Sequence, residues 1–224
     1  MPHTIALIGG TGPEGRGLAT RFALAGHRVI LGSRDAARGE AAAAELAAAL
    51  PRGQVEGGDN ASAVSEAEVA ILVVPYAAHR STLEELRDAL AGKIVVDAVV
   101  PMEFDRGPRW VEVEAGSAAE EAVEVLGDSA RIVAAFHNLA ASELLDPAAR
   151  IDADVLVVGR DEDAKKTVVA LANDIEGVRG VDAGPIRFAR HVEGLTILLA
   201  GINMWYKTHS AVRIVNLDVT TAPR

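Results

Sequence analysis

A glycine-rich turn directly after the first apolar run constrains the fold of this chain more than any other feature. The run covers residues 5–8, the turn contains Gly10-x-Gly12-x-x-Gly15, and residues 18–25 have the pattern of an amphipathic helix. In a strand–turn–helix unit, these glycines make the tight turn, let the backbone approach a pyrophosphate, and let helix and strand pack closely. The helix N-terminus then offers N–H groups and partial positive charge to phosphates. We therefore predict a dinucleotide-binding unit; a tight turn without a ligand is the alternative.

The end of the second predicted strand indicates which dinucleotide binds. A chain that binds NAD usually has an acidic residue there for the ribose 2′-hydroxyl, whereas this chain has Gly32-Ser33-Arg34. A hydroxyl and a guanidinium can hold a 2′-phosphate through charge-assisted hydrogen bonds. With Asp35 as a helix cap, Arg38 can face the same adenosine end, and Thr11 could add a hydroxyl. NADP is therefore predicted over NAD; solvated arginines at a helix start are the alternative.

Apolar runs of strand length alternate with alanine-rich helical patterns along most of the chain, which is typical of βαβ units and a parallel sheet. Strands are expected near residues 4–8, 28–32, 55–56, 69–74, 94–97, 131–134, 154–158 and 178–182. Helices are expected near residues 18–25, 36–50, 61–67, 80–91, 118–126 and 162–175. The pattern predicts an α/β fold with a doubly wound, mostly parallel sheet of the NADP-binding Rossmann type. The ligand then belongs at the carboxyl ends of the strands.

The last part of the chain departs from this alternation. Residues 101–116 contain Pro101, Pro108 and two glycines around Trp110, and they indicate a loop over the ligand face or an irregular connection. After Gly184-Pro185 we expect a long helix over residues 188–209 and a final strand over residues 212–217. The predicted division is an NADP-binding domain over residues 1–184 and a C-terminal segment over residues 185–224, which completes the substrate pocket and a dimer contact.

Composition excludes several classes of function. The 224 residues are half hydrophobic, enough for one α/β core with a small appendage. The formal net charge of −10, without a run of Lys and Arg, argues against nucleic acid as a partner. Cysteine is absent, and no His, Asp or Glu cluster has metal-ligand spacing, so neither a thiol nucleophile nor a metal is expected. Because no leader and no sufficiently long apolar stretch is seen, a cytoplasmic protein without a membrane partner is predicted.

His137 is the strongest polar candidate for chemistry. It follows the sixth predicted strand at the carboxyl end of the sheet, and Asn138 is adjacent and could serve the same pocket. A neutral imidazole there could hydrogen-bond a substrate carbonyl or support charge on a reduced ring; a structural histidine at a strand end is the alternative. No Tyr-x-x-x-Lys arrangement for ketone reduction is visible. Hydride transfer between two ring carbons requires chiefly that the rings are aligned, which suits a chain with few polar catalytic candidates.

Several motifs together resemble the coenzyme F420-dependent NADP oxidoreductases over nearly the whole chain. They are the opening I-G-G-T-G-x-x-G-x-G-L-A, the G-S-R of residues 32–34, the V-V-P of residues 73–75, the A-F-H of residues 135–137 and the D-A-G-P of residues 182–185. The D-A-G-P motif, followed by R-H-V-E-G-L-T, is the more particular one. The resemblance implies hydride transfer between NADPH and an 8-hydroxy-5-deazaflavin ring, with NADP and coenzyme F420 as small-molecule partners, and a homodimer.

The resemblance also implies roles for individual residues. Thr11, Ser33, Arg34 and Arg38 match the family's 2′-phosphate contacts, and Gly10, Gly12 and Gly15 match its pyrophosphate turn. The stretch Val74-Pro75-Tyr76 matches one that passes near the nicotinamide, and His137 matches a histidine on the deazaflavin side. Pro13 and Glu14 depart from the family pattern within the turn, and an ionised Glu14 there would have to point to solvent. The family's histidine after the fourth strand is shifted to His79, and residues 205–209 do not follow the family's glycine-containing pattern.

Two other functions fit part of the sequence. An NADP-dependent reductase of a small imine or keto acid would share the dinucleotide unit, but such enzymes build their substrate site from a longer C-terminal helical domain than this tail. A non-catalytic NADP-binding redox sensor would equally lack an acid–base constellation.

Overall fold

Eight strands form one sheet in the computed structural model, which describes residues 1–219. The strands are β1 (Thr4–Ile8), β2 (Arg28–Ser33), β3 (Gln54–Asp59), β4 (Val69–Leu72), β5 (Ile94–Asp97), β8 (Arg131–Ala134), β9 (Ala153–Gly159) and β10 (Val178–Gly184). Their order is β10-β9-β8-β5-β4-β1-β2-β3, and every neighbouring pair is parallel except β8 with β9. The strand order reverses at β1, between β2 and β4. The predicted doubly wound, mostly parallel sheet is confirmed.

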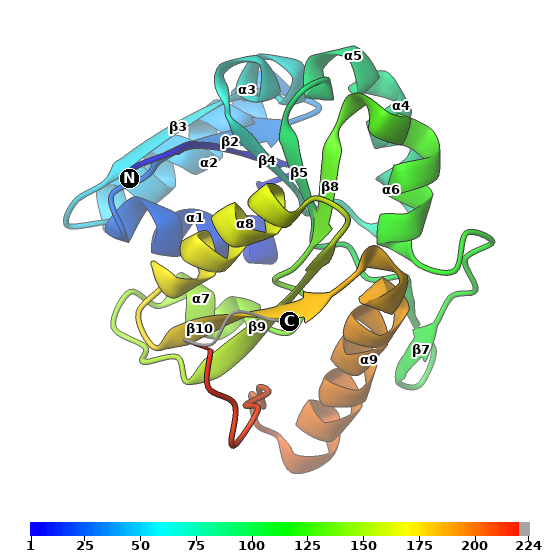
Figure 1. Ribbon diagram of the computed structural model, residues 1–224. Coiled ribbons are helices and arrows are strands. Elements are labelled where there is room, and N and C mark those ends of the chain that lie inside the picture. The colour runs from blue at the N-terminus through cyan, green and yellow to red at the C-terminus, as the bar shows by residue number, and fades with distance from the viewer. Residues whose placement is uncertain (220–224) are drawn as a thin grey trace.

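Helices cover both faces of the sheet, as Figure 1 shows. One face carries α1 (Pro13–Leu24), α2 (Ala36–Ala49), α7 (Ala141–Leu145) and α8 (Glu162–Asn173); the other carries α3 (Asn60–Glu66), α4 (His79–Glu85), α5 (Arg87–Leu90) and α6 (Ala118–Leu126). Side chains alternate along each strand, so Ile5 and Leu7 pack into the first core and Ala6 and Ile8 into the second, all fully buried. An apolar run without polar alternation is what a strand covered on both faces requires.

Side-chain caps fix where several of the helices begin. The carboxylate of Asp35 accepts a hydrogen bond from the N–H of Ala37 at the start of α2, as the sequence predicted. Ser117 and Asp161 cap α6 and α8 in the same way. In contrast, the N-cap of α1 is Gly12, which has no side chain to donate or accept. The N-terminus of α1 is therefore left open for an external ligand.

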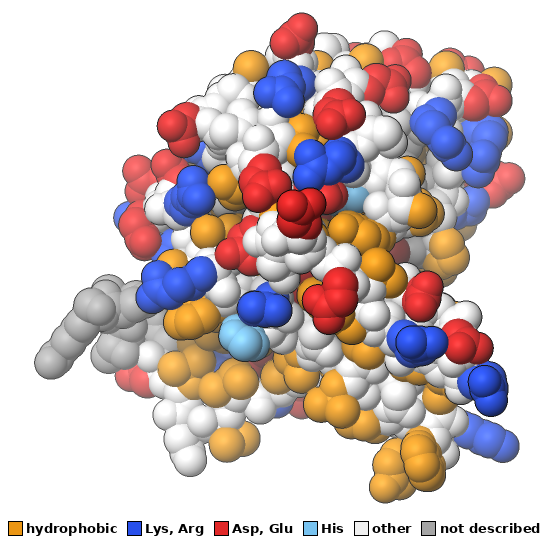
Figure 2. Space-filling model, turned by 90° about the vertical axis from the view of Figure 1, so that its right-hand side faces the viewer, with side chains coloured by type: hydrophobic (Ala, Val, Ile, Leu, Met, Phe, Trp, Pro, Cys, Tyr) orange, Lys and Arg blue, Asp and Glu red, His pale blue; other side chains and the backbone are white. Residues whose placement is uncertain are grey.

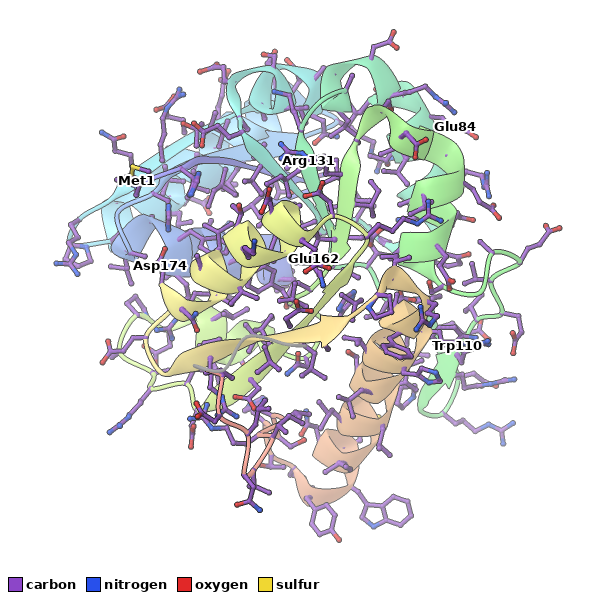
Figure 3. The ribbon with its side chains drawn as sticks, in the orientation of Figure 1. Met1, Glu84, Trp110, Arg131, Glu162 and Asp174 are labelled. Carbon is purple, nitrogen blue, oxygen red and sulfur yellow. The ribbon has the colours of Figure 1, made fainter. Side chains whose placement is uncertain are left out.

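Two predicted segments before the C-terminal part differ in the structure. The helix expected over residues 80–91 is divided at Leu86 into α4 and α5. Residues 101–116 are not an irregular loop throughout, because β6 (Met102–Phe104) and β7 (Pro108–Trp110) pair as an antiparallel hairpin. Its turn is closed by the N–H of Asp105, which donates to the carbonyl of Gly107 at 3.0 Å. Figure 3 shows Trp110 at the hairpin beside the long C-terminal helix.

The C-terminal segment consists of the short helix η3 (Ile186–Phe188), the helix α9 (Ala189–Tyr206) and an irregular stretch. α9 ends before the predicted residue 209, because Lys207 adopts a left-handed conformation with φ 54°. The strand predicted over residues 212–217 was wrong. In this stretch, side chains rather than a neighbouring strand form hydrogen bonds with the backbone of Ile214. Its N–H donates to the carboxylate of Asp154, and its carbonyl accepts from the guanidinium of Arg179. Residues 220–224, the end of the predicted segment 185–224, lie outside the described residues.

Candidate functional site

A cavity of about 590 Å³ opens at the carboxyl ends of β1, β2, β4 and β5. It lies where the strand order reverses, which is the place that ligands occupy in sheets of this type. The predicted cofactor-binding residues that line it are Thr11, Gly12, Pro13, Glu14, Gly15, Ser33, Arg34, Arg38, Val74, Pro75 and Tyr76. Gly10 lies behind the turn rather than in the lining, and Asn138 and the predicted catalytic residue His137 lie in another cavity. The structure thus brings most of the predicted dinucleotide contacts together.

The glycine-rich turn is shaped by close backbone approaches. A Cβ atom on Gly10 would lie 2.7 Å from the carbonyl oxygen of Leu7, and one on Gly15 would lie 2.5 Å from Cα of Gly10. The N–H of Gly10 donates to the carbonyls of Leu7 and Gly32, which fastens the turn to β1 and β2. Gly12, by contrast, has nothing within 4 Å of where a Cβ would be. Gly10 and Gly15 therefore hold the turn together, while Gly12 leaves space for a phosphate group.

The end of the cavity beside β2 carries two free cations. Arg34 and Arg38 are exposed, and within residues 1–219 neither forms an ion pair with an acidic side chain. Nη2 of Arg38 lies 3.5 Å from Oγ1 of Thr11, and Ser33 is buried beside them at 5 % exposure. The carboxylate of Asp35 is occupied in capping α2. This end therefore offers two hydroxyls and two guanidinium groups, a donor set that suits a phosphate group.

One residue at this end was missed by sequence reasoning. Asn60 begins α3 directly after β3 and lines the cavity. Its Oδ1 accepts a hydrogen bond from the N–H of Gly9 at 3.2 Å, so it supports the glycine-rich turn from the side of β2. Its position after the carboxyl end of a strand was the signal that could have identified it.

The opposite end of the cavity is mainly apolar. Val74, Pro75 and Tyr76 follow β4, and Val99 and Met102 follow β5. The last two were not predicted, although they come after a strand that ends at the same edge of the sheet. Burial raises the pKa of the Tyr76 phenol, so its hydroxyl stays protonated near neutral pH. The surface suits the face of a flat ring and offers no charged side chain for acid–base chemistry.

Glu14 is half-buried and does not turn fully to solvent, as an ionised side chain in this turn would have to. Its carboxyl oxygen Oε1 is buried and has no hydrogen-bond partner among the described residues. Burial raises the pKa of this carboxyl to about 8. Glu14 is therefore uncharged over most of the neutral range, which removes the expected repulsion of a pyrophosphate.

His137 and Asn138 line a smaller cavity of about 80 Å³ between β8 and α9. His137 is 6 % exposed, neither ring nitrogen has a partner within the described part of the chain, and burial lowers the pKa of the ring to about 4. Oγ1 of Thr196 on α9 donates to the main-chain carbonyl of His137 at 2.9 Å. Nδ2 of Asn138 donates to the carbonyl of Asp154 at 2.8 Å, which makes it a structural link to β9. His137 is thus a neutral imidazole with unused hydrogen-bonding capacity.

A buried ionic network behind the apolar end was not predicted. Nε2 of His79 lies 2.7 Å from Asp97 at the end of β5, and its Nδ1 lies 2.7 Å from Glu121 on α6. Burial by itself lowers the pKa of His79. The charge of Asp97 and the hydrogen bonds to both carboxylates outweigh this effect and raise the pKa to about 9. Asp97 also accepts a hydrogen bond from the N–H of Val99 at 3.0 Å, just after β5. The network therefore fixes the segment that lines the cavity after β5.

Glu193 joins this network to the C-terminal helix. Its two carboxyl oxygens accept hydrogen bonds from the N–H groups of Ala118 and Ala119 at 3.0 and 3.1 Å, at the N-terminus of α6. Burial and the charge of Asp97 raise the pKa of Glu193 to about 8. Across residues 1–219, no three His, Asp or Glu side chains form a group suited to a metal ion. Nor does any helix in that range have the length and apolar character needed to cross a membrane.

Comparison with known proteins gives similarities over almost the whole chain. The family described as NADP oxidoreductase, coenzyme F420-dependent, matches residues 4–101. The F420-dependent NADP reductase of Methanothermobacter marburgensis is 43 % identical over 220 residues, which cover 95 % of this chain and 98 % of that protein. The protein of the same name from Methanocaldococcus jannaschii is 40 % identical over 223 residues, which cover 96 % and 99 %.

Solved structures extend the comparison to the fold. A candidate F420-dependent NADP reductase from Arthrobacter sp. FB24 superimposes with a TM-score of 0.81 and 28 % identity, covering 96 % of this chain and 100 % of that one. A pyrroline-5-carboxylate reductase from Coxiella burnetii has a TM-score of 0.62 at 18 % identity, and the match covers 92 % of this chain but 67 % of that one. The second similarity is one of fold alone.

Proposed function

This chain belongs to the coenzyme F420-dependent NADP oxidoreductase family, and from this premise we propose that it transfers a hydride between NADP(H) and the 8-hydroxy-5-deazaflavin coenzyme F420. The observation that carries the proposal is that the glycine-rich turn, Ser33, Arg34 and an apolar surface suited to a flat ring all line one cavity. Relatives of nearly the same length, at up to 43 % identity, are named F420-dependent NADP reductases.

In this proposal the cavity binds NADP(H) along its whole length. The turn from Gly10 to Gly15 takes the pyrophosphate on the N-terminus of α1. Thr11, Ser33, Arg34 and Arg38 take the 2′-phosphate, since they supply hydroxyl and guanidinium donors without a competing ion pair. The stretch from Val74 to Tyr76 then places the nicotinamide ring over the ends of β4 and β5.

The chain's contribution to catalysis is alignment of two rings. The two cofactors, when bound, supply the hydride donor and the hydride acceptor. The apolar lining from Val74, Pro75 and Val99 excludes water from the nicotinamide end and offers no group that would protonate a reduced ring. No acid or base is needed for transfer between two ring carbons, which fits the absence of a charged side chain at this end of the cavity.

His137 is proposed to position the deazaflavin rather than to exchange a proton. With a pKa of about 4, its ring is neutral near pH 7 and can donate one hydrogen bond and accept another. Both nitrogens are free to do so. Thr196 ties the backbone of His137 to α9, so the C-terminal segment, residues 185–224, completes the second half of the site beside the NADP-binding domain, residues 1–184.

A homodimer through α9 is part of the same proposal. Large apolar side chains on this helix are exposed, including Leu198 at 60 %, Trp205 at 87 % and Tyr206 at 76 %. Hydrophobic side chains gather on the lower part of the face shown in Figure 2. Light scattering after gel filtration tests the dimer. The cytoplasmic location expected from the sequence also stays a prediction.

The experiment that tests the function mixes purified protein with NADPH and oxidised F420 and follows the visible absorbance of the deazaflavin. Loss of this absorbance in proportion to enzyme supports hydride transfer. Tight NADPH binding without turnover would instead favour a redox sensor. Reduction of a cyclic imine acid, with no change in F420, would favour the imine reductase class.

A further inference from the structure

Glu14 is an unusual residue at the place where a dinucleotide pyrophosphate is expected. It is the second residue of α1 and lies within the glycine-rich turn, between Gly12 and Gly15. The N-terminus of a helix normally stabilises a carboxylate. Here, however, Oε1 is buried without a hydrogen-bond partner among the described residues, although the side chain also lines the main cavity. A half-buried acid with one buried, unsatisfied oxygen inside a ligand cavity has a free donor or acceptor to offer the ligand.

The direction of the side chain follows from its neighbours on α1. Gly17 and Arg21, three and seven residues further along, lie on the same face of the helix. A Cβ atom on Gly17 would lie 2.6 Å from Cβ of Leu144, and the guanidinium of Arg21 donates to the carbonyl of Leu144 at 3.0 Å. This face of α1 is therefore turned toward α7 and away from solvent, and Glu14 continues it at the mouth of the cavity.

The charged and titratable groups around Glu14 are already engaged or lie at the ends of the cavity. On α1 itself, Arg16 pairs with Glu45 at 2.9 Å and Arg21 donates to carbonyls beside α7. Arg34 and Arg38 line the adenosine end, and Tyr76 lines the opposite end. Since none of them donates a hydrogen bond to Glu14, no cation compensates an ionised carboxylate at this position.

The dinucleotide brings its own negative charge to the same turn. A pyrophosphate held by the N–H groups of the turn would lie next to the carboxyl group of Glu14. Two neighbouring negative groups repel each other strongly in a site that is partly shielded from water. A protonated carboxyl group, in contrast, can donate its hydrogen to an oxygen of the ligand. Binding and ionisation of Glu14 should therefore be linked.

We propose that Glu14 binds NADP(H) as an uncharged carboxylic acid, donating its proton in a hydrogen bond to an oxygen of the dinucleotide, and that ionised Glu14 excludes the dinucleotide. This inference rests on the proposed function. Its consequence is that binding takes up a proton whenever the free protein has lost the one on Glu14. Burial places that loss at a pH of about 8.

Calorimetric titration of the full chain with NADP⁺ from pH 7.5 to pH 9.5 tests the proposal. Repeating each titration in buffers of different ionisation enthalpy gives the number of protons taken up. The dissociation constant is expected to rise toward tenfold per pH unit above about 8, with proton uptake approaching one per bound dinucleotide. Glu14→Gln should bind NADP⁺ at pH 7.5, and its dissociation constant should rise much less with pH, because the amide donates a hydrogen bond at every pH. Glu14→Leu should bind more weakly but also without the rise.

Two matched controls separate Glu14 from other groups. Glu85→Gln removes an exposed glutamate of α4 and should keep the wild-type pH dependence. Tyr76→Phe should keep it as well, since burial moves the pKa of that phenol above its ordinary value of 10. A wild-type affinity that stays constant from pH 8 to pH 9.5, or a rise of the same size in Glu14→Gln, would overturn the inference. Failure of NADP⁺ to bind at any pH would instead overturn the proposed function.

Discussion

The buried pair of His79 and Asp97 makes the stability of this protein depend on pH in a calculable way. Both side chains are fully buried, and their nitrogen and oxygen atoms are 2.7 Å apart. The pKa of His79 is about 9 in the folded protein against an ordinary value of 6.5. A raised histidine pKa adds stability that is complete below pH 6.5 and is lost as the pH rises through 9. The full contribution is about 3 kcal/mol, and roughly 2 kcal/mol of it disappears between pH 7 and pH 9.5.

The variant His79→Gln isolates this contribution, because an amide keeps hydrogen-bonding capacity but cannot carry the positive charge. Glu14 titrates near pH 8 in both proteins, and the charge of His79 is the smallest of the causes that set the pKa of Glu193, so most of the difference between wild type and variant reports on His79. Urea unfolding at pH 7 and pH 9.5 gives the free energy of unfolding for each. The difference in free energy of unfolding between wild type and variant should be roughly 2 kcal/mol larger at pH 7 than at pH 9.5.

The control for this measurement is His191→Gln, which changes an exposed histidine on α9. The difference in free energy of unfolding between this variant and the wild type should change by no more than about a few tenths of a kcal/mol between pH 7 and pH 9.5. If the difference for His79→Gln is equal at pH 7 and pH 9.5, the imidazole is not charged between its two carboxylates and the reasoning fails.

Two other substitutions test the cavity and its support. Arg34→Ala should weaken the binding of NADPH by about 2 kcal/mol, roughly 30-fold in dissociation constant, because it removes one charge-assisted hydrogen bond to the 2′-phosphate. The affinity for NADH should stay nearly unchanged. Equal losses of affinity for both dinucleotides would contradict that assignment. Arg21→Ala should lower the free energy of unfolding by about 3 kcal/mol, because the guanidinium donates to the buried carbonyl of Leu144 and to the partly buried carbonyls of Asp146 and Ala149. Urea midpoints measure this loss, and a change below 1 kcal/mol would show that water replaces the guanidinium.

Local signals were enough to predict the sheet and one end of the site. Runs such as residues 94–97 and 131–134 coincide with β5 and β8 because a strand covered on both faces has three or more apolar residues in succession, with Asp97 and Arg131 only at the strand ends. The glycine-rich turn and the sequence Gly32-Ser33-Arg34 are continuous in the chain, so their placement follows from the strand that precedes each of them. The cap at Asp35 is local in the same sense.

Features that depend on distant contacts were missed or wrong. The helix α7 is only five residues long and depends on Arg21 of α1, which donates to carbonyls at its C-terminal end and just beyond it. Residues 212–217 have the composition of a strand, but Asp154 and Arg179 satisfy their backbone groups and no ladder forms. The partners of His79 come from β5 and α6, 18 and 42 residues away. The burial of Glu14 depends on packing that no short-range pattern encodes.

Direct transfer of hydrogen between the two rings is the central claim, and isotopic labelling measures it. NADPH deuterated at C4 of the nicotinamide, on each face in turn, is mixed with oxidised F420 and the enzyme in ordinary water, and the reduced deazaflavin is analysed by mass spectrometry and NMR. We predict that one of the two labelled forms delivers its deuterium to C5 of the deazaflavin and that the other delivers none. Reduced F420 without deuterium from either form, or label recovered in the water, would contradict direct hydride transfer.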